Sequence, residues 1–228
     1  MIIEIATLFP EMFKGPFTES IIKRAVESQY VEFKFHNPRD FSTDKHKKVD
    51  DYPFGGEAGM VMTPQPLADM INHLTSKEAF DAIIFMTPDG ARLDQRMVNS
   101  FSHFNRILIL NGHYKGIDQR IRDKYVTHEV SIGDYVISGG ELATAVFCDA
   151  LVRIIPGVLG DSSSALTDSF QDGLLAPPVY TRPASFRGMS VPEVLRSGNF
   201  GEIDQWKLEK ALEKTKIRRP DLLNPSKK

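Results

Sequence analysis

The sequence predicts an α/β fold in which a parallel sheet has helices on both faces, followed by a small, mostly helical C-terminal region. Apolar, β-branched runs typical of buried strands alternate with segments of helical spacing, and this alternation favours a parallel sheet covered on both sides. Three of the runs also lead directly into glycine-containing loops. The expected strands cover residues 2–9, 31–35, 81–87, 106–110 and 126–132.

The helices expected between these strands follow from the spacing of apolar residues and from capping signals. Thr18 can cap the first helix, and Pro66 suits the first turn of the second. The expected helices cover residues 18–26, 66–74, 93–101 and 142–155.

The helix at 142–155 is almost wholly apolar and is closed by Pro156 and Gly157, a strong helix stop. A helix that is apolar all round has to be buried all round, so we expect it at a packed interface. Asp149 and Arg153 are two of its few charges. Their i, i+4 spacing also fits a plainer interpretation, a simple ion pair along one helix.

A long polar connection, residues 37–63, joins the second strand to the second helix. It contains a basic cluster from Lys45 to Lys48, followed by DDYPFGGEAGM at 50–60. Loops of this length inside a compact domain are usually functional or disordered. The acidic, aromatic and glycine residues of this loop favour a functional role.

The composition is that of an ordinary globular protein, with 41% hydrophobic and 25% charged residues. A net charge of −2 gives no overall sign of nucleic-acid binding, so such a partner would have to be met by local patches. No apolar run reaches the ~20 residues that cross a bilayer, and the first residues lack the basic region of a signal peptide. The single cysteine, Cys148, fits a reducing cytoplasm, and its place in an apolar helix predicts inert packing.

Glycine-containing loops follow three expected strands, with the sequences PDGAR, NGHYKG and IGDYVISGG. Ligands of parallel sheets bind beyond the carboxyl ends of the strands, so these loops are expected to converge on one pocket. The chain has no phosphate-binding glycine motif, no metal-binding pair of cysteines or histidines, and no G-x-S-x-G nucleophile motif. A cofactor without phosphate, such as an adenosyl-sulfonium compound, would fit a pocket lined by backbone. The plainer alternative is that Gly139 and Gly140 only form a tight turn.

The composition changes after Gly160. We expect a first domain at 1–160, a flexible linker at 161–167, and a C-terminal domain at 168–228 with helices at 191–198 and 204–217. Residues 207–228 contain eight Lys or Arg and three acidic residues, which fits a face that contacts phosphates. A solvated charged helix explains the same pattern.

The order of motifs along the chain resembles the TrmD family of bacterial tRNA (guanine-N1)-methyltransferases, which belongs to the knotted SPOUT class. Each motif is weak alone, but so many in one order are very specific. The matching segments are LFPEMF at 8–13, DDYPFGG at 50–56, GMVM at 59–62, TPDG at 87–90, GHYKGIDQR at 112–120, SIGDYVISGGEL at 131–142, RIIPGVLG at 153–160, DSF at 168–170, YTRP at 180–183, VPEVLRSGN at 191–199 and RRPDL at 218–222.

The resemblance implies a parallel α/β domain with a deep trefoil knot, which general rules of topology would argue against. It also implies a cytoplasmic homodimer with shared active sites, S-adenosylmethionine as methyl donor, and tRNA with a guanosine just 3′ of the anticodon as substrate. The positions that match the cofactor site are Pro88, Gly90, Gly112, Tyr114, Ile132, Gly133, Asp134, Tyr135, Val136, Ile137, Gly139 and Gly140.

By the same resemblance, Asp168 is the general base that removes the proton from guanine N1, and Arg153 stabilises the charge on O6. From the residues alone, Asp168 and Ser169 could simply cap a helix. Three positions depart from the family pattern: Glu57 within the glycine run, and His113 and Lys115 where arginine and glutamate are usual. A requirement for Mg²⁺ stays open, because the sequence offers no cluster of ligands.

Overall fold

The computed structural model describes residues 1–160 and 168–223. The chain divides into two compact units, Met1–Gly160 and Asp161–Lys228, which are described separately. The linker expected at 161–167 lies outside the described residues. None of the helices in the described part of the chain is both long and apolar enough to cross a membrane.

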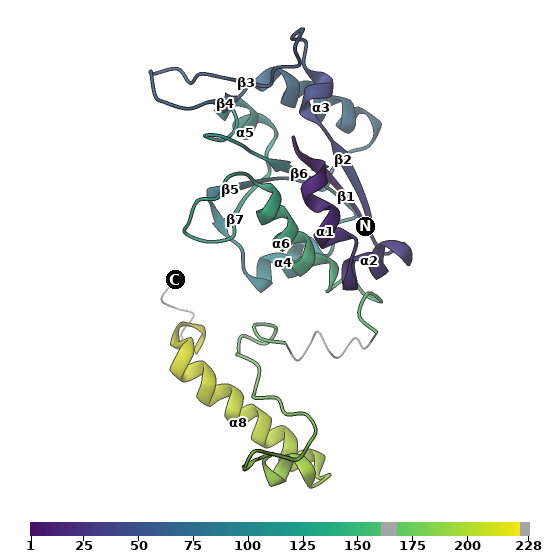
Figure 1. Ribbon diagram of the computed structural model, residues 1–228, viewed down its shortest axis with the longest axis vertical. Helices are drawn as coiled ribbons and strands as arrows, with labels where there is room; N and C mark the ends of the chain where they lie inside the picture. Colours follow the sequence, from purple (N-terminus) through teal and green to yellow (C-terminus); the bar gives the residue numbers. More distant parts are fainter. Residues whose placement is uncertain (161–167, 224–228) are drawn as a thin grey trace. The chain divides into compact units, whose positions relative to one another are not determined.

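The first unit is built on a five-stranded sheet in the order β2-β1-β6-β5-β7, and all its strand pairs are parallel (Figure 1). This confirms the expected parallel α/β fold. The sheet strands are β1 (Ile2–Ala6), β2 (Glu32–His36), β5 (Ala82–Arg92), β6 (Arg106–Asn111) and β7 (His128–Ser131). The antiparallel pair β3 (Asp50–Asp51) and β4 (Val61–Met62) lies within the long polar connection.

Helices cover both faces of the sheet because alternate strand residues point to opposite sides. Ile107 and Ile109 of β6 belong to one apolar core, and Leu108 and Leu110 belong to the other. The first core is completed by α1 (Lys14–Phe17), α2 (Ser20–Glu27), α4 (Gln95–Phe101) and α6 (Glu141–Val152). The second is completed by α3 (Pro64–Lys77) and α5 (Gln119–Tyr125). Short 3-10 helices cover Pro10–Phe13 and Pro38–Phe41.

Two helix predictions need correction. The first long helix begins at Ser20, and its N-cap Glu19 makes no side-chain capping bond. Thr18 does not cap it, since the Thr18 hydroxyl donates back to the carbonyl of Lys14. The apolar helix is α6, which ends at Val152 and is not buried all round within one chain: Leu142 is 54% and Val146 51% exposed.

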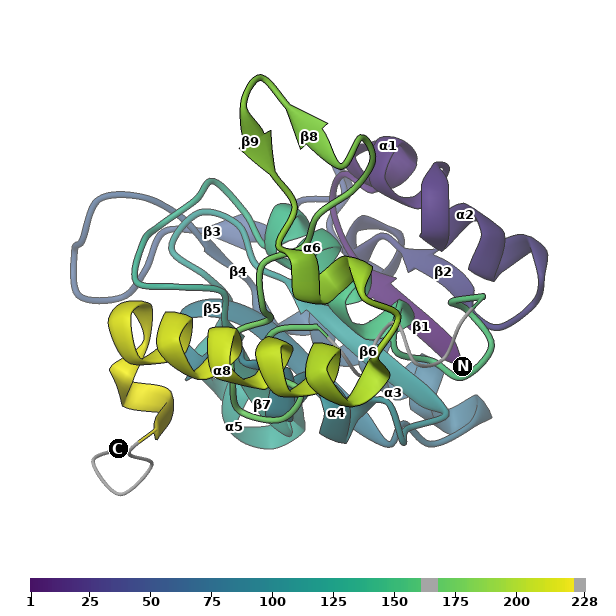
Figure 2. The same ribbon diagram turned by 90° about the horizontal axis from the view of Figure 1, so that it is seen from below.

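The second unit contains one long helix, α8 (Phe200–Arg218), which starts before the predicted residue 204 because Asn199 caps its N-terminus (Figure 2). The chain around Leu175, which precedes α8, packs on this helix: the Leu175 amide donates a hydrogen bond of 2.9 Å to the hydroxyl of Thr215. The helix predicted at 191–198 is only a 3-10 turn, Glu193–Arg196. A two-stranded hairpin, β8 (Ser185–Phe186) and β9 (Met189–Ser190), and a 3-10 turn, Pro220–Leu223, complete this unit.

Candidate functional site

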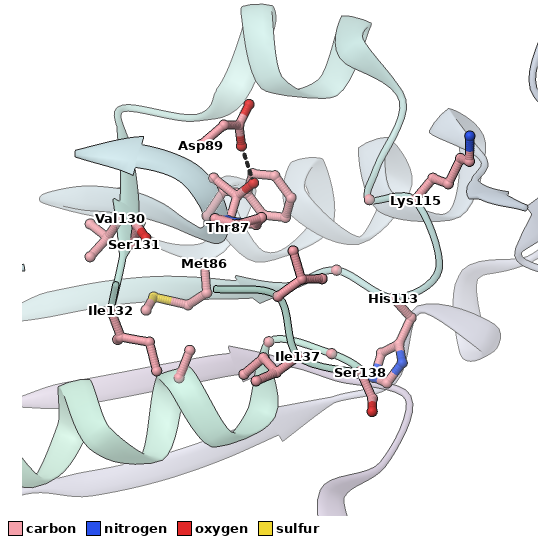
Figure 3. A pocket seen from close by; sticks show the side chains of 18 of the residues that line it. Met86, Thr87, Asp89, His113, Lys115, Val130, Ser131, Ile132, Ile137 and Ser138 are labelled. Carbon is pink, nitrogen blue, oxygen red and sulfur yellow. Dashed lines mark hydrogen bonds between the residues drawn. The ribbon is translucent and has the colours of Figure 1, made fainter. Parts of the chain in front are cut away.

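The three glycine-containing loops meet at one cavity of about 470 Å³ beyond the carboxyl ends of β5, β6 and β7 (Figure 3). This is the edge of the sheet at which the sequence predicts a pocket, and the volume lies within the usual range for small-molecule sites. The lining residues come from segments 85–89, 112–116 and 130–140, with Arg122 of α5 and Ala143 of α6.

The first wall arises from an excursion in the middle of β5. Met86 and Ala91 both pair with Val130 of β7, so the residues between them leave the ladder, and Thr87, Pro88 and Asp89 line the cavity. The sequence predicts that the strand ends in a turn there, whereas the chain returns to the sheet and continues to Arg92. A Cβ on Gly90 would lie 2.5 Å from the backbone nitrogen of Val130, so only glycine fits this close approach.

The second wall, residues 112–116, is held close to the sheet. A Cβ on Gly112 would lie 2.9 Å from the ring of Phe85, and Tyr114 adopts a φ of 59°, which is uncommon for a residue with a side chain. The amide of Gly140 donates to the carbonyl of Gly112 over 3.0 Å, so this wall is joined to the third one. Gly139 and Gly140 therefore form part of a cavity rather than an isolated tight turn.

Arg122 and Asp89, two charged side chains that line the cavity, already have partners of opposite charge. Arg122 lies 2.7 Å from Asp89 and 2.7 Å from Glu129. A hydrogen bond from Thr87, together with Arg122, holds the pKa of the Asp89 carboxyl below its ordinary value. His113 lies 2.7 Å from Glu141. The rest of the lining combines apolar side chains and glycine backbone with the hydroxyl groups of Thr87, Ser131 and Ser138. The ammonium of Lys115, which also lines the cavity, is paired with Glu57, and this suits a ligand without phosphate groups.

Two of the three residues that depart from the pattern of the resembled family, Glu57 and Lys115, pair with one another. The Lys115 ammonium makes an ion pair with the carboxylate of Glu57, and this pair lowers the pKa of Glu57. The stem of Lys115 also lies against Gly59, where a Cβ would be 3.3 Å away. The reversed charge at Lys115 is thus matched by an acidic residue from the long polar loop.

In the described part of the chain, no group of three histidine, cysteine or acidic side chains is arranged to hold a metal ion. The carboxylates nearest the cavity, Asp89 and Glu141, are already bound to Arg122 and His113. The donor set in the described part of the chain therefore does not fit a resident Mg²⁺.

Comparison with known proteins decides the family. The model of tRNA (Guanine-1)-methyltransferase TrmD matches residues 1–225. The chain belongs to the TrmD family. It is 59% identical to the tRNA (guanine-N(1)-)-methyltransferase of Flavobacterium psychrophilum over 98% of this chain and 100% of that protein. It is similar to proteins of the same name from Cytophaga hutchinsonii, at 56% identity over 97% and 94% of the two chains, and from Bacteroides fragilis, at 55% over 98% and 99%.

Most of the positions that the TrmD resemblance assigns to the cofactor lie at the cavity. Gly90 and Asp134 do not line it: Gly90 packs against the backbone of β7, and Asp134 is exposed. The lining residues among the expected ones are Pro88, Gly112, Tyr114, Ile132, Gly133, Tyr135, Val136, Ile137, Gly139 and Gly140.

The sequence analysis missed several lining residues. Phe85, Met86 and Thr87 could have been found, since they end the predicted strand at the edge where ligands bind. No local sequence pattern predicts Arg122 at the cavity, because its position there depends on how α5 packs on the sheet. Ala143 was hidden in the apolar run of α6.

The two expected catalytic residues belong to different units of the TrmD chain. Arg153 is half-buried and directly follows the last residue of α6, where its amide donates to the carbonyl of Asp149. Asp168 is half-buried in the second unit. The interpretation of Asp168 and Ser169 as a helix cap is wrong, since residues 168–184 contain turns and extended chain, and Ser169 accepts a bond from the Ala176 amide.

Proposed function

We propose that this chain is a cytoplasmic tRNA (guanine-N1)-methyltransferase that transfers a methyl group from S-adenosylmethionine to N1 of the guanosine just 3′ of the anticodon. The observation that carries the proposal is the cavity formed by three glycine-containing loops at one sheet edge. Membership of the TrmD family supports the reaction, and the similar proteins carry the corresponding name.

The cofactor would be held mainly by backbone groups of the three loops, where Gly112, Gly139 and Gly140 carry no side chain. Its adenosine fits the apolar surface around Ile132 and Ile137, and Gly112 and Gly140 give access to backbone groups. When bound, S-adenosylmethionine supplies an electrophilic methyl group on a sulfonium. The cavity has no unpaired cluster of cations for phosphates, in line with this choice.

In this reaction the protein removes one proton from the guanine base and stabilises the negative charge that results. Guanine N1 is protonated at neutral pH and becomes a good nucleophile only when this proton leaves. Asp168 acts as the general base and takes the proton on a carboxylate oxygen. The negative charge then spreads to guanine O6, where the Arg153 guanidinium stabilises it with its fixed fork of donors.

We further propose a homodimer with shared active sites, and the exposed apolar side of α6 supports the dimer. Leu142 and Val146 lie one helical turn apart and are about half exposed, although α6 is packed on its other side by fully buried residues. A second copy of the chain would cover this side. We also propose that the loop from 132 to 140 and α6 complete a trefoil knot, which is consistent with the bond that joins Gly140 to Gly112.

The second unit is the part that we assign to tRNA binding. α8 carries Lys207, Lys210, Lys214, Lys216 and Arg218 along one helix. Some of these cations pair locally, such as Lys210 with Glu213 at 2.6 Å, but both side chains of that pair are well exposed, and ion pairs in solvent are weak. Phosphate contacts of this kind position an RNA without reading its sequence.

Transfer of a labelled methyl group to tRNA tests the assignment of Asp168 and Arg153. A positioned base contributes about 10²–10⁴-fold, so Asp168→Asn should lose at least that much rate while it still binds the cofactor. Arg153→Ala should lose rate in the same way. Asp69→Asn, on the exposed side of α3, serves as a control with full activity. Full activity of Asp168→Asn would exclude that residue as the base.

Two rival functions are separated by simple measurements. An enzyme that modifies another base would methylate transcripts with adenosine after the anticodon as well as those with guanosine. A non-catalytic RNA-binding dimer would show no binding of S-adenosylmethionine in calorimetry, even at millimolar ligand. We expect methylation of the guanosine transcript alone and clear cofactor binding.

A further inference from the structure

Arg122 lines the cavity, and no role assigned so far explains its contacts there. It belongs to α5, which follows the second wall of the cavity along the chain, and its side chain is 17% exposed. Its Nε and Nη2 atoms donate hydrogen bonds of 2.7 Å to the two carboxylate oxygens of Glu129 in β7. Nη2 also donates a bond of 2.7 Å to Asp89, in the excursion of β5 that forms the first wall.

The contact between Arg122 and Glu129 is of a strong kind. Two parallel hydrogen bonds match the planar fork of the guanidinium to one carboxylate, and this arrangement fixes the orientation of both groups. The bonds with Glu129, with a smaller contribution from Asp89 and against the effect of burial, raise the pKa of Arg122, so the cation is permanent. Exposed ion pairs contribute little to stability, but bidentate pairs within a network are the exception.

The bond from the guanidinium to Asp89 holds the tip of the excursion. The other oxygen of this carboxylate accepts a hydrogen bond from the hydroxyl of Thr87 (Figure 3). Thr87, Pro88 and Asp89 line the cavity, and the chain then returns to β7 through Gly90, which packs on the β7 backbone. The excursion is therefore attached to β7 by Gly90 at its far end and by the guanidinium at its tip.

The same guanidinium lies close to the second wall. Its central carbon is 5.3 Å from the centre of the Phe85 ring, within the range of an attractive cation–π contact. The opposite neighbour of this buried ring is Gly112, where a Cβ would lie 2.9 Å from the ring. Arg122 thus contacts the first wall directly, and Phe85 connects it to the second.

We infer that Arg122 is a positioning residue of the cofactor cavity: its guanidinium holds the excursion of β5 against β7 and α5, and so sets the space available to the methyl donor. This inference rests on the proposed function of the cavity. The fork of donors is what matters, because one side chain has to bond Glu129 twice and Asp89 once. A lysine keeps the charge, but its ammonium is a compact point charge without this planar fork.

The helix α5 also offers a matched control, Arg120. Its Nε and Nη2 atoms donate hydrogen bonds of 2.8 Å to the two carboxylate oxygens of Asp118, so it has the same kind of fork as Arg122. Its side chain is 72% exposed, and it is not among the residues that line the cavity. Arg120→Lys therefore removes a comparable pair from the same helix without disturbing the excursion.

Calorimetric titration of the full-length protein with S-adenosylmethionine compares the wild type, Arg122→Lys, Arg122→Met and Arg120→Lys. Both Arg122 variants should bind the cofactor about tenfold more weakly, the order expected when a hydrogen bond between charged groups is lost. Arg120→Lys should bind as tightly as the wild type. In methyl-transfer assays the Arg122 variants should show a raised KM for S-adenosylmethionine and an unchanged KM for tRNA.

A double variant tests whether Arg122 and Asp89 act through one contact. Asp89→Asn keeps the shape of the side chain and removes its charge, so it should also weaken cofactor binding. The double variant with Arg122→Met should bind no more weakly than Arg122→Met alone, because the contact is already lost. Additive losses would contradict an action of Arg122 through Asp89.

Hydrogen exchange without cofactor separates positioning from a general loss of stability. A peptide covering residues 86–93 contains the return to β7, where the Leu93 amide donates to the carbonyl of Ser131 over 2.8 Å. This peptide should exchange faster in Arg122→Lys than in the wild type. A peptide covering β1 should exchange at the wild-type rate in both proteins.

Wild-type affinity for S-adenosylmethionine in Arg122→Lys would overturn the inference, as would equal weakening by Arg120→Lys. Faster exchange of the β1 peptide to the same extent would overturn it too, because the effect would then be one on the stability of the whole unit. Failure of the proposed function is distinct, since the wild type would then bind no S-adenosylmethionine. Thermal melting identifies a variant that has lost its fold, and Arg122→Lys, the milder change, remains the decisive comparison.

Discussion

At the scale of single residues, Cys148 illustrates how burial decides chemistry. The side chain is fully buried within α6, and burial, with a smaller effect of the Asp149 charge, raises the pKa of its thiol well above the ordinary value. The thiolate is the reactive form, so little of it exists at neutral pH. The sequence predicted an inert cysteine from its apolar neighbours, and the structure confirms the burial.

We therefore predict that native Cys148 resists alkylation. At pH 8 the folded protein should show no added mass after treatment with excess iodoacetamide, because the thiol is neither ionised nor accessible. The same protein in urea should take up one equivalent, which is the positive control. Rapid modification under native conditions would contradict the packing of α6.

Asp81 gives a prediction about pH. Its carboxylate accepts hydrogen bonds from the amides of Arg106 and Asn105, at 2.9 and 2.7 Å, and these bonds lower its pKa below the ordinary value of 3.8. Because the pKa of Asp81 is lower in the folded than in the unfolded chain, the ionised carboxylate stabilises the fold at pH values above the ordinary pKa. This stability is lost as pH falls through the pKa of the folded state.

Asp81→Asn should accordingly lower the free energy of unfolding at pH 7 by about 1 kcal/mol, a small value because the side chain is exposed to solvent. The difference from wild type should begin to shrink as pH falls below the ordinary pKa of 3.8, and it should be lost once pH has passed the lower pKa of the folded state, where the wild-type carboxyl is protonated as well. Urea unfolding of both proteins at pH 7 and at acid pH measures the difference in free energy of unfolding. If the difference in free energy of unfolding were the same at both pH values, the stabilisation by Asp81 would not depend on its charge.

At the scale of elements, α4 shows how one cap starts a short helix. The Asp94 carboxylate accepts a bond of 2.9 Å from the Met97 amide at the helix N-terminus. α4 has only seven residues and packs on α6, so loss of its cap should weaken the packing between the two helices. Asp94→Ala should lower the free energy of unfolding by about 1 kcal/mol, whereas Asp94→Asn should keep most of it. Chemical denaturation of the two variants side by side checks this order.

The elements also show what local pattern can predict. The parallel strands and the loops at their ends follow from apolar runs that stop at glycine, and these signals are local. The continuation of β5 to Arg92 cannot be predicted from local sequence, because it depends on the pairing of both Met86 and Ala91 with Val130 of β7. The position of Arg122 at the cavity likewise depends on how α5 packs. Cavity residues near the strand ends were therefore predictable, whereas those brought in by packing were not.

At the scale of the whole molecule, the exposed side of α6 is the feature that a single chain leaves unexplained. Leu142 and Val146 of α6 are each about half exposed, at 54% and 51%. Phe9 and Met12, which lie just before and within the 3-10 helix Pro10–Phe13 that packs on α6, are each 43% exposed. The burial of every side of this helix, expected from its composition, is not met within one chain. A partner copy that covers these side chains would reconcile the composition with the structure.

This gives the last prediction, which concerns assembly. Val146→Asp places a charge in the middle of the apolar side of α6, where burial against a second chain would remove it from water, a strongly unfavourable change. The wild type should sediment as a dimer at micromolar concentration, and the variant should sediment as a monomer with the same helical circular dichroism. Val179→Asp is the matched control, since Val179 is 90% exposed in the second unit.

Assembly and activity are linked in this prediction, because the active sites that we propose are shared and would require both chains. A monomeric Val146→Asp should lose methyl transfer although Asp168 and Arg153 are unchanged. It should still bind S-adenosylmethionine if each cavity is complete within one chain, as the lining of the cavity by residues of the first unit implies. Retention of full transfer by a monomer would mean that one chain holds the whole active site, and the exposed side of α6 would then need another partner.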